Sequence, residues 1–399
     1  MATSNNIGDD DDDPFACFDS SDDEDEDRRQ EIVGKLQDHT LDISRDPGNG
    51  VLAFHAGTEV ALLHYVKTEL DATGKSNTMV RDEENTNTER APESAISEQA
   101  RTILGLVDSY CLSRHWMMHV GPEKAGPLRD FISKCLGSRK RKNSNDHGSD
   151  AVVVVELGTY CGYSSIFIAK TILEYHRDSM AAEANTGVNQ QEDSDRDDPL
   201  FHIYSVEVVE GFARVARELI QLAGMEAYIT VILAQHPDDA IPGKIGGPKT
   251  NAGEAPPSLS SELMQRLPRG SEHDGESTVT TTKPIDFLFV DHDKSLYLPH
   301  LRELENTGFI REGTFVAADN VVFAQIDDYR DYMSRLAEQG IVETRLEDSL
   351  MVEYCEPELR SPDESLEHNK GETTTTKEML QDGIEFSIYL TDPARLPDS

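Results

Sequence analysis

Two apolar runs of this 399-residue chain end directly in side chains that carry oxygen. The run at 285–290 leads into Asp291, and the run at 314–318 leads into Asp319 and Asn320. If both runs are parallel strands of one sheet, these side chains gather where such sheets bind ligands. Two carboxylates and an amide are hard oxygen donors that suit Mg²⁺. Solvated acids at strand ends explain any one of these residues, but explain all three together less well.

A lysine stands close to the first of these acids. Lys294 follows Asp291 by three residues. Lysine is usually a surface residue, but beside a divalent cation its ammonium form is disfavoured, so that it could act as a general base. His292 is the only histidine nearby, which disfavours zinc; we expect it to be structural.

An earlier apolar run ends in a glycine-bearing turn. The segment 156–164 reads ELGTYCGYS and opens a predicted helix. Gly158 and Gly162 let the backbone approach a ligand, and the helix N-terminus offers free N–H groups. This arrangement is typical of nucleotide binding, although glycine also occurs in such turns for steric reasons alone.

An acidic residue ends the next predicted strand. Glu207 stands where doubly wound folds commonly bind ribose hydroxyls. Its distance from Glu156 along the chain approaches the usual ~20 residues only when the polar insert at 177–198 is removed. A solvated carboxylate at a strand end is the equally weighted alternative.

These residues belong to a regular alternation of predicted strands and helices. Alternation of this kind predicts an α/β fold, a doubly wound Rossmann-like sheet that is mostly parallel, with a late antiparallel strand and helices on both faces. We expect strands at 151–157, 202–208, 229–234, 285–290, 314–318, 350–354 and 384–390. We expect helices at 97–113, around 131–136, and at 164–175, 212–223, 298–306 and 326–338.

Composition divides the chain into two regions. Residues 1–95 are acidic and are expected to be largely disordered, with one short helix at 58–70. Residues 96–392 should form the domain, interrupted by disordered polar inserts near 138–150, 177–198, 243–283 and 357–380. The basic run 139–142 in the first insert reads as a solvated loop, with a nuclear import signal as the alternative.

The formal net charge is −39, which makes nucleic acid and anionic membranes poor partners. The five cysteines are widely spaced without a CxxC pair, which argues against a disulfide framework. We find no secretory signal and no apolar run long enough for a membrane helix, so a cytoplasmic protein is expected. A monomer is the default expectation.

Taken together, these motifs resemble the catechol O-methyltransferase family. The similarity covers roughly residues 97 to 391 once the inserts are removed. It rests on the ordered segments 107–121, 156–164, 205–207, 222–225, 291–299, 313–321 and 353–354.

The resemblance implies a methyl transfer from S-adenosylmethionine to one hydroxyl of a vicinal diol on a small aromatic substrate. It implies that Mg²⁺ is held by Asp291, Asp319 and Asn320, and that Lys294 is the base. Glu353 would accept a hydrogen bond from the neighbouring hydroxyl, Asn320 would lie beside the substrate, and Trp116 would wall its ring. The cofactor pocket would be lined by Met118, Val120, Glu156, Gly158, Tyr160, Ser164 and Glu207.

Several positions depart from the family pattern. Asp293 replaces an aromatic residue that packs on the adenine, and His119 replaces an asparagine. The stretch 321–325 lacks the family's proline, and the serine–glutamine pair after the third strand is replaced near 236–237. The proposed metal ligands and base are kept, whereas the residues that wall the adenine and the substrate change. The identity of the phenolic substrate therefore does not follow from the resemblance. The alternatives are a non-catalytic S-adenosylmethionine-binding module and an NAD-dependent dehydrogenase, which the lack of GxGxxG weakens.

Overall fold

The computed structural model describes nine ranges of the chain. The described residues are 58–73, 92–114, 117, 119–142, 151–185, 200–234, 258–274, 277–350 and 381–393. Within these ranges, no helix combines the length and apolar character needed to cross a bilayer.

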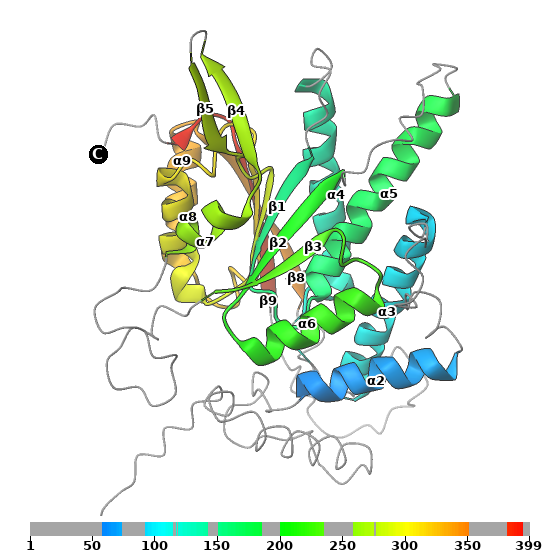
Figure 1. Ribbon diagram of the computed structural model, residues 1–399. Coiled ribbons are helices and arrows are strands. Elements are labelled where there is room, and N and C mark those ends of the chain that lie inside the picture. Colours follow the sequence, from blue (N-terminus) through cyan, green and yellow to red (C-terminus); the bar gives the residue numbers. More distant parts are fainter. Residues whose placement is uncertain are drawn as a thin grey trace, which may run out of the picture.

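A seven-stranded sheet forms the centre of the molecule (Figure 1). Its order is β3-β2-β1-β6-β7-β9-β8, and every neighbouring pair from β3 to β7 is parallel. Only β9 runs against its neighbours. The expected doubly wound, mostly parallel sheet with a late antiparallel strand is therefore confirmed. The strands are β1 (Val152–Leu157), β2 (Phe201–Glu207), β3 (Ile229–Leu233), β6 (Phe287–Val290), β7 (Phe315–Ala318), β8 (Val342–Leu350) and β9 (Gln381–Tyr389).

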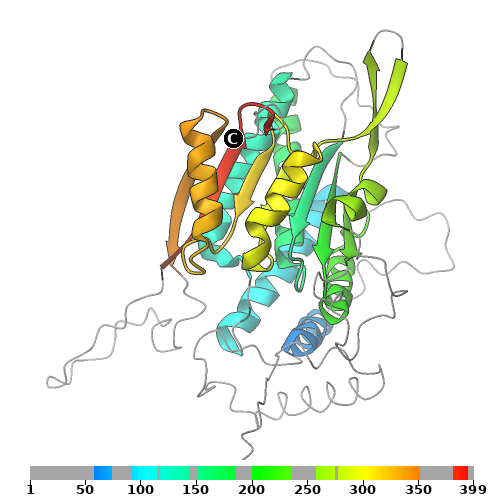
Figure 2. The ribbon, with the colours of Figure 1, turned by 90° about the vertical axis from the view of Figure 1, so that its left-hand side faces the viewer.

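Helices cover both faces of this sheet, because its central strands are apolar on both faces. In β1 all six residues are buried: Val152 and Val154 pack into one core, whereas Val153 and Val155 pack into the other. The first core is covered by α3 (Glu93–Ser113), α4 (Gly121–Lys142), α5 (Tyr163–Asn185) and α6 (Glu210–Leu222). The second is covered by α7 (Leu259–Arg266), α8 (Tyr297–Asn306) and α9 (Asp327–Glu338). Figure 2 shows α8 and α9, yellow and orange, on one side of the sheet.

The helix expected at 58–70 is α2 (Thr58–Ala72), and it is part of the domain. Leu62, Val66 and Leu70 lie at helical spacing and are almost fully buried in the first core. The helix packs against α3 and α6, below them in Figure 1. The packed domain therefore begins before residue 96, where composition alone had placed its boundary.

Parts of the expected inserts are also regular structure. Helix α4 continues through the basic run to Lys142, and α5 continues to Asn185, since arginine, lysine and alanine are good helix formers. Within 243–283 lie α7 and a separate hairpin of β4 (Arg269–Asp274) and β5 (Ser277–Thr282). β5 reads STVTTT, and β-branched residues favour strands. The insert 357–380 lies outside the described residues.

The strand expected at 350–354 falls almost entirely outside the described residues. Only Leu350 is described, and it is the last residue of β8, which spans Val342–Leu350 and pairs along its length with β9. β8 is an edge strand in which charged and apolar residues are mixed, so it lacks the continuous apolar run that marks the central strands.

Candidate functional site

The glycine turn and the first acidic strand end lie against each other. β1 and β6 pair in parallel up to Leu157 and Val290, and the Asp291 N–H donates to the Leu157 carbonyl at 2.8 Å. Gly158 follows with φ +96°, and a Cβ placed on it would lie 2.0 Å from the Asp291 carbonyl oxygen. Only glycine fits such an approach. The sheet thus brings the two predicted halves of the site together, at the point where strand order reverses.

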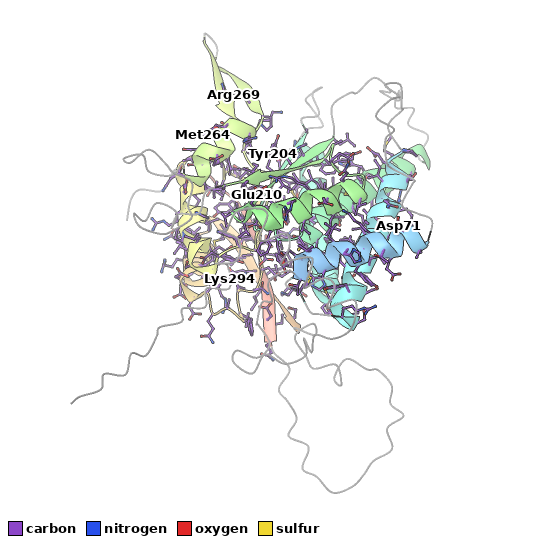
Figure 3. All side chains as sticks on the ribbon, turned by 60° about the horizontal axis from the view of Figure 1, so that its bottom comes forward. Asp71, Tyr204, Glu210, Met264, Arg269 and Lys294 are labelled. Carbon is purple, nitrogen blue, oxygen red and sulfur yellow. The ribbon has the colours of Figure 1, made fainter. Side chains whose placement is uncertain are left out.

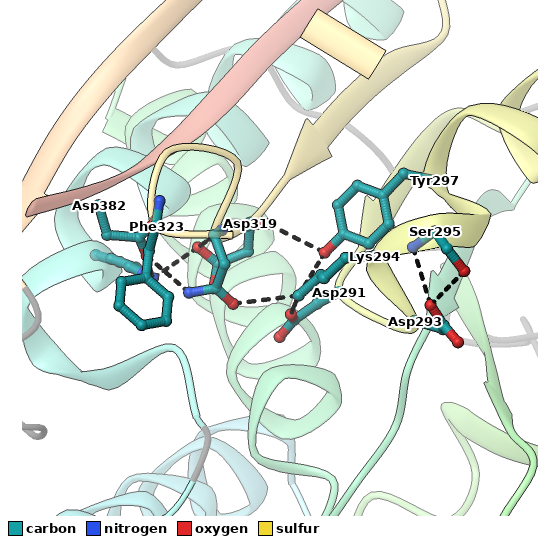
Figure 4. A network of polar contacts seen from close by, with 10 residues as sticks. Asp291, Asp293, Lys294, Ser295, Tyr297, Asp319, Phe323 and Asp382 are labelled. Atoms are coloured by element: carbon teal, nitrogen blue, oxygen red, sulfur yellow. Dashed lines mark hydrogen bonds and ion pairs between the residues drawn. The ribbon is translucent and has the colours of Figure 1, made fainter. Parts of the chain in front are cut away.

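Lys294 lies between the ends of β6 and β7. A short 3₁₀ turn, η5 (Lys294–Leu296), follows β6, and the Asp293 side chain caps it by accepting from the Ser295 N–H. The Lys294 Nζ donates to Asp291 Oδ1 at 2.8 Å, to the Tyr297 hydroxyl at 2.7 Å and to Asn320 Oδ1 at 3.3 Å (Figure 4). The lysine side chain is 34% exposed, so a ligand can reach it. In Figure 3 it lies at the end of the molecule away from Arg269 of the hairpin.

Two charged residues that the sequence analysis did not single out complete this network. The Lys124 Nζ of α4 donates to Asp319 Oδ1 at 2.8 Å and to Asp382 Oδ2 of β9 at 2.6 Å. All three side chains are at most 2% exposed. A signal was present in the sequence: Lys124 shares a helical face with Leu128 and Phe131, which are buried.

Asn320 takes an uncommon backbone conformation. Its φ of +58° is left-handed, a region that asparagine tolerates better than most residues. Its N–H donates to Asp319 Oδ1 at 2.8 Å, and its side-chain Nδ2 donates to Asp382 Oδ2 at 2.7 Å. The amide oxygen consequently faces Lys294.

The donor set fits a divalent cation. Within the described ranges, the bonds to Asp291 and Asp319 use only Oδ1 of each carboxylate, so each retains an oxygen without a bond. Burial raises the pKa of Asp319 to about 6; repulsion from Asp291 and Asp382 acts in the same direction, and Lys124 opposes it. A nearby cation would relieve that repulsion. The described part of the chain contains no cluster of three or more His, Cys, Asp or Glu side chains that could hold a metal ion. The expected ligand set contains only two such residues, Asp291 and Asp319, and its third member is the Asn320 amide.

Glu156 presents a buried carboxylate beneath the glycine turn. Its Oε2 accepts hydrogen bonds from Ser165 and Ser205, whereas its Oε1 is buried without a partner in the described structure. Burial raises the pKa of Glu156 to about 7, although hydrogen bonds from serine side chains oppose the shift. An unpaired buried acceptor fits a cationic ligand group, and S-adenosylmethionine carries both an ammonium and a sulfonium.

Glu207 holds the turn itself. Its Oε1 accepts from the N–H groups of Val208 and Val209 at 2.8 and 2.9 Å, and its Oε2 accepts from the Tyr160 N–H at 2.8 Å. Tyr160 has φ +46°, so this bond supports a strained turn. A carboxylate offers about four acceptor sites, which leaves room for a ribose hydroxyl beside these three bonds.

The remaining predicted residues divide into two groups. Val120 is buried in the first core, and Ser164 is buried in the first turn of α5 at the end of the glycine segment. Trp116, Met118 and Glu353 lie outside the described residues.

His119 is bonded inside the protein. Its Nδ1 lies 3.0 Å from the Met117 carbonyl and its Nε2 3.3 Å from Asp108 Oδ1, and its ring meets Tyr163 edge-on. His292 also has its partners inside the protein: its ring lies parallel to that of Tyr297, with centroids 5.1 Å apart, and its Nε2 lies 2.9 Å from His300 Nδ1.

Comparison with known proteins finds O-methyltransferases among the relatives of this chain. No protein-family model matches the chain. The chain is 25% identical to the catechol O-methyltransferase of Bos taurus over 239 residues, which are 60% of this chain and 61% of that protein. It is 26% identical to catechol O-methyltransferase B of Danio rerio over 257 residues, 63% of this chain and 70% of that protein. It is 27% identical to a probable O-methyltransferase of Mycobacterium tuberculosis over 252 residues, 63% of this chain and 78% of that protein. The chain thus spans less than two thirds of the bovine relative.

Proposed function

Because the chain is a relative of the catechol O-methyltransferases, we propose that it transfers a methyl group from S-adenosylmethionine to one hydroxyl of a catechol-like vicinal diol on a small aromatic substrate. The observation that carries this proposal is the position of the Lys294 Nζ, within hydrogen-bonding distance of oxygens from both strand ends. An amine beside two metal-type donors suits the removal of a proton from a hydroxyl held there.

Each part of the site has a proposed task. Asp291, Asp319 and Asn320 would hold Mg²⁺, which when bound lowers the pKa of a coordinated hydroxyl. Lys294 takes the hydroxyl proton on its Nζ, while Asp291 and Tyr297 hold that nitrogen in place. Trp116 and Glu353 are proposed to orient the aromatic ring and its second hydroxyl.

The cofactor residues act by binding and orientation. S-adenosylmethionine supplies the methyl group. The Glu156 carboxylate would face the positive charge of the cofactor, and Glu207 would bind its ribose. The backbone of the turn from Gly158 to Tyr160 would lie against the cofactor, with Met118, Val120 and Ser164 around it. A fixed geometry in a site that excludes water favours this transfer, because the charges of the reacting groups cancel in the product.

A second candidate is a non-catalytic module that binds S-adenosylmethionine. It is favoured by two lysines that already pair with the proposed metal ligands, Lys124 with Asp319 and Lys294 with Asp291.

We further propose that the protein is a cytoplasmic monomer without nucleic acid or membrane partners.

Initial rates of methyl transfer would test the proposal. We expect product from catechol with S-adenosylmethionine and Mg²⁺, little from phenol, which lacks the second hydroxyl, and little after EDTA treatment. Cofactor binding without transfer to any vicinal diol would support the non-catalytic module. Calorimetric titration with NAD tests the dehydrogenase alternative, and we expect no binding.

A further inference from the structure

Asp382 is buried, paired with a lysine and hydrogen-bonded to a proposed metal ligand. Its Oδ2 accepts from the Lys124 Nζ at 2.6 Å and from the Asn320 Nδ2 at 2.7 Å, and its Oδ1 accepts from the Phe323 N–H at 3.1 Å. Its side chain is fully buried. No part of the proposed chemistry uses Asp382 directly, so these bonds call for another role.

We infer that Asp382, with Lys124 as its counter-ion, is a positioning residue that turns the Asn320 amide so that its oxygen, and not its nitrogen, faces the metal site. The inference rests on the proposed function, because Asn320 is a metal ligand only under that proposal. It adds a residue of β9 and a residue of α4 to a site otherwise built on β6 and β7.

The chemistry of the two neighbours determines which way the amide points. The two ends of an asparagine amide have nearly the same shape, so packing alone does not select between them. An ionised carboxylate only accepts hydrogen bonds, and an ammonium only donates them. Asp382 therefore binds Nδ2, and Lys294 on the other side binds Oδ1 at 3.3 Å. A metal ion requires the same oxygen end, whereas an amide nitrogen pointed at the ion would repel it.

Lys124 keeps Asp382 in the acceptor-only form. A buried carboxylate without a cation is costly and becomes protonated instead. The Asp382 carboxylate accepts from three donors, the Lys124 Nζ, the Asn320 Nδ2 and the Phe323 N–H, which is the pattern of an acceptor-only group. Lys124 reaches both Asp382 and Asp319, so one buried amine serves both carboxylates.

The late antiparallel strand fixes Asp382 in place. The Val321 N–H donates to the Gly383 carbonyl at 3.2 Å, beside the bond from Phe323 to Asp382. Both bonds attach the loop after Asn320 to β9. Gly383 lies so close to β8 that an added Cβ would be 2.9 Å from Leu346 and 3.0 Å from the Glu347 carbonyl. The strand and loop therefore hold the carboxylate against the amide in one arrangement (Figure 4).

The experiment measures Mn²⁺ binding to the full chain by electron paramagnetic resonance, with Mn²⁺ as the probe for Mg²⁺. Asp382→Asn should weaken Mn²⁺ binding by about 10- to 100-fold, the usual effect of losing a group that orients a metal ligand. S-adenosylmethionine affinity, measured by calorimetry, should stay within about twofold of the wild-type value, because Asp382 does not contact the glycine turn. Asp348→Asn is the matched control: it removes the same charge from the exposed β8 position that pairs with Gly383.

The outcomes separate this inference from the proposed function. Wild-type protein that binds no Mn²⁺ overturns the magnesium part of the proposed function and this inference with it. Wild-type binding that Asp382→Asn leaves unchanged overturns the inference alone. If Asp382→Asn does not fold, the wild-type chain itself still tests the inference. A crystal structure of the wild-type chain with Mn²⁺ gives a check without substitutions: an Asn320 amide that does not contact Asp382 would also overturn the inference.

Discussion

Gly158 lies against the backbone carbonyl of Asp291 more closely than any other residue type would allow. An added Cβ would be 2.0 Å from that oxygen, and φ is +96°. The contact joins the proposed cofactor turn to the proposed metal residue, so the two parts of the site have a fixed relative position.

Gly158→Ala should therefore lower the free energy of unfolding by roughly 2–5 kcal/mol, from backbone strain and overpacking. Urea unfolding measures this change in the free energy of unfolding. Gly105→Ala is the control, since Gly105 lies in α3 with nothing within 4 Å of an added Cβ, and there alanine should stabilise slightly. Equal effects of the two substitutions would contradict the tight contact.

Glu156 makes stability depend on pH. Its pKa in the folded protein is raised from 4.5 to about 7, so the folded state holds the proton more tightly than the unfolded state does. The contribution of Glu156 to the free energy of unfolding is fully present below pH 4.5 and is lost as pH rises through 7. Its total is roughly 3 kcal/mol. Glu156→Gln should remove this slope in the ligand-free protein, as measured by denaturation from pH 5 to 8.

Glu338→Gln, at an exposed position of α9, serves as the comparison and should keep the wild-type slope. A Glu156→Gln profile parallel to that of the wild type would show that Glu156 does not set the dependence.

Glu207 accepts hydrogen bonds from three backbone N–H groups, and one of them, that of Tyr160, belongs to the glycine turn. Glu207→Gln places an NH₂ group against N–H donors, and we expect about a 10-fold or greater loss of S-adenosylmethionine affinity, or about 1.4 kcal/mol. Calorimetry measures the affinity. Glu210→Gln changes an exposed glutamate at the start of α6, three residues further along the chain, and should bind normally. Normal binding by Glu207→Gln would remove that residue from the cofactor site.

The sequence predicted the strands that carry the site more reliably than the residues that surround it. The runs before Asp291 and Asp319 are buried on both faces, and this made them visible as continuous apolar segments. Lys124 and Asp382 escaped notice because charged residues are usually exposed, and their burial depends on an ion pair between residues 258 positions apart. Helix α2 was expected as a helix, but its place in the core was not, because composition does not show what packs against a helix.

The most direct test of the account is the single-turnover rate of methyl transfer by Lys294→Ala, with catechol, Mg²⁺ and saturating S-adenosylmethionine. We predict cofactor affinity within about twofold of wild type and a rate lower by about 100-fold or more, the usual contribution of a general base. Lys134→Ala, at an exposed position of α4, should react at the wild-type rate. A Lys294→Ala rate equal to that of the wild type would contradict the proposed role of the lysine.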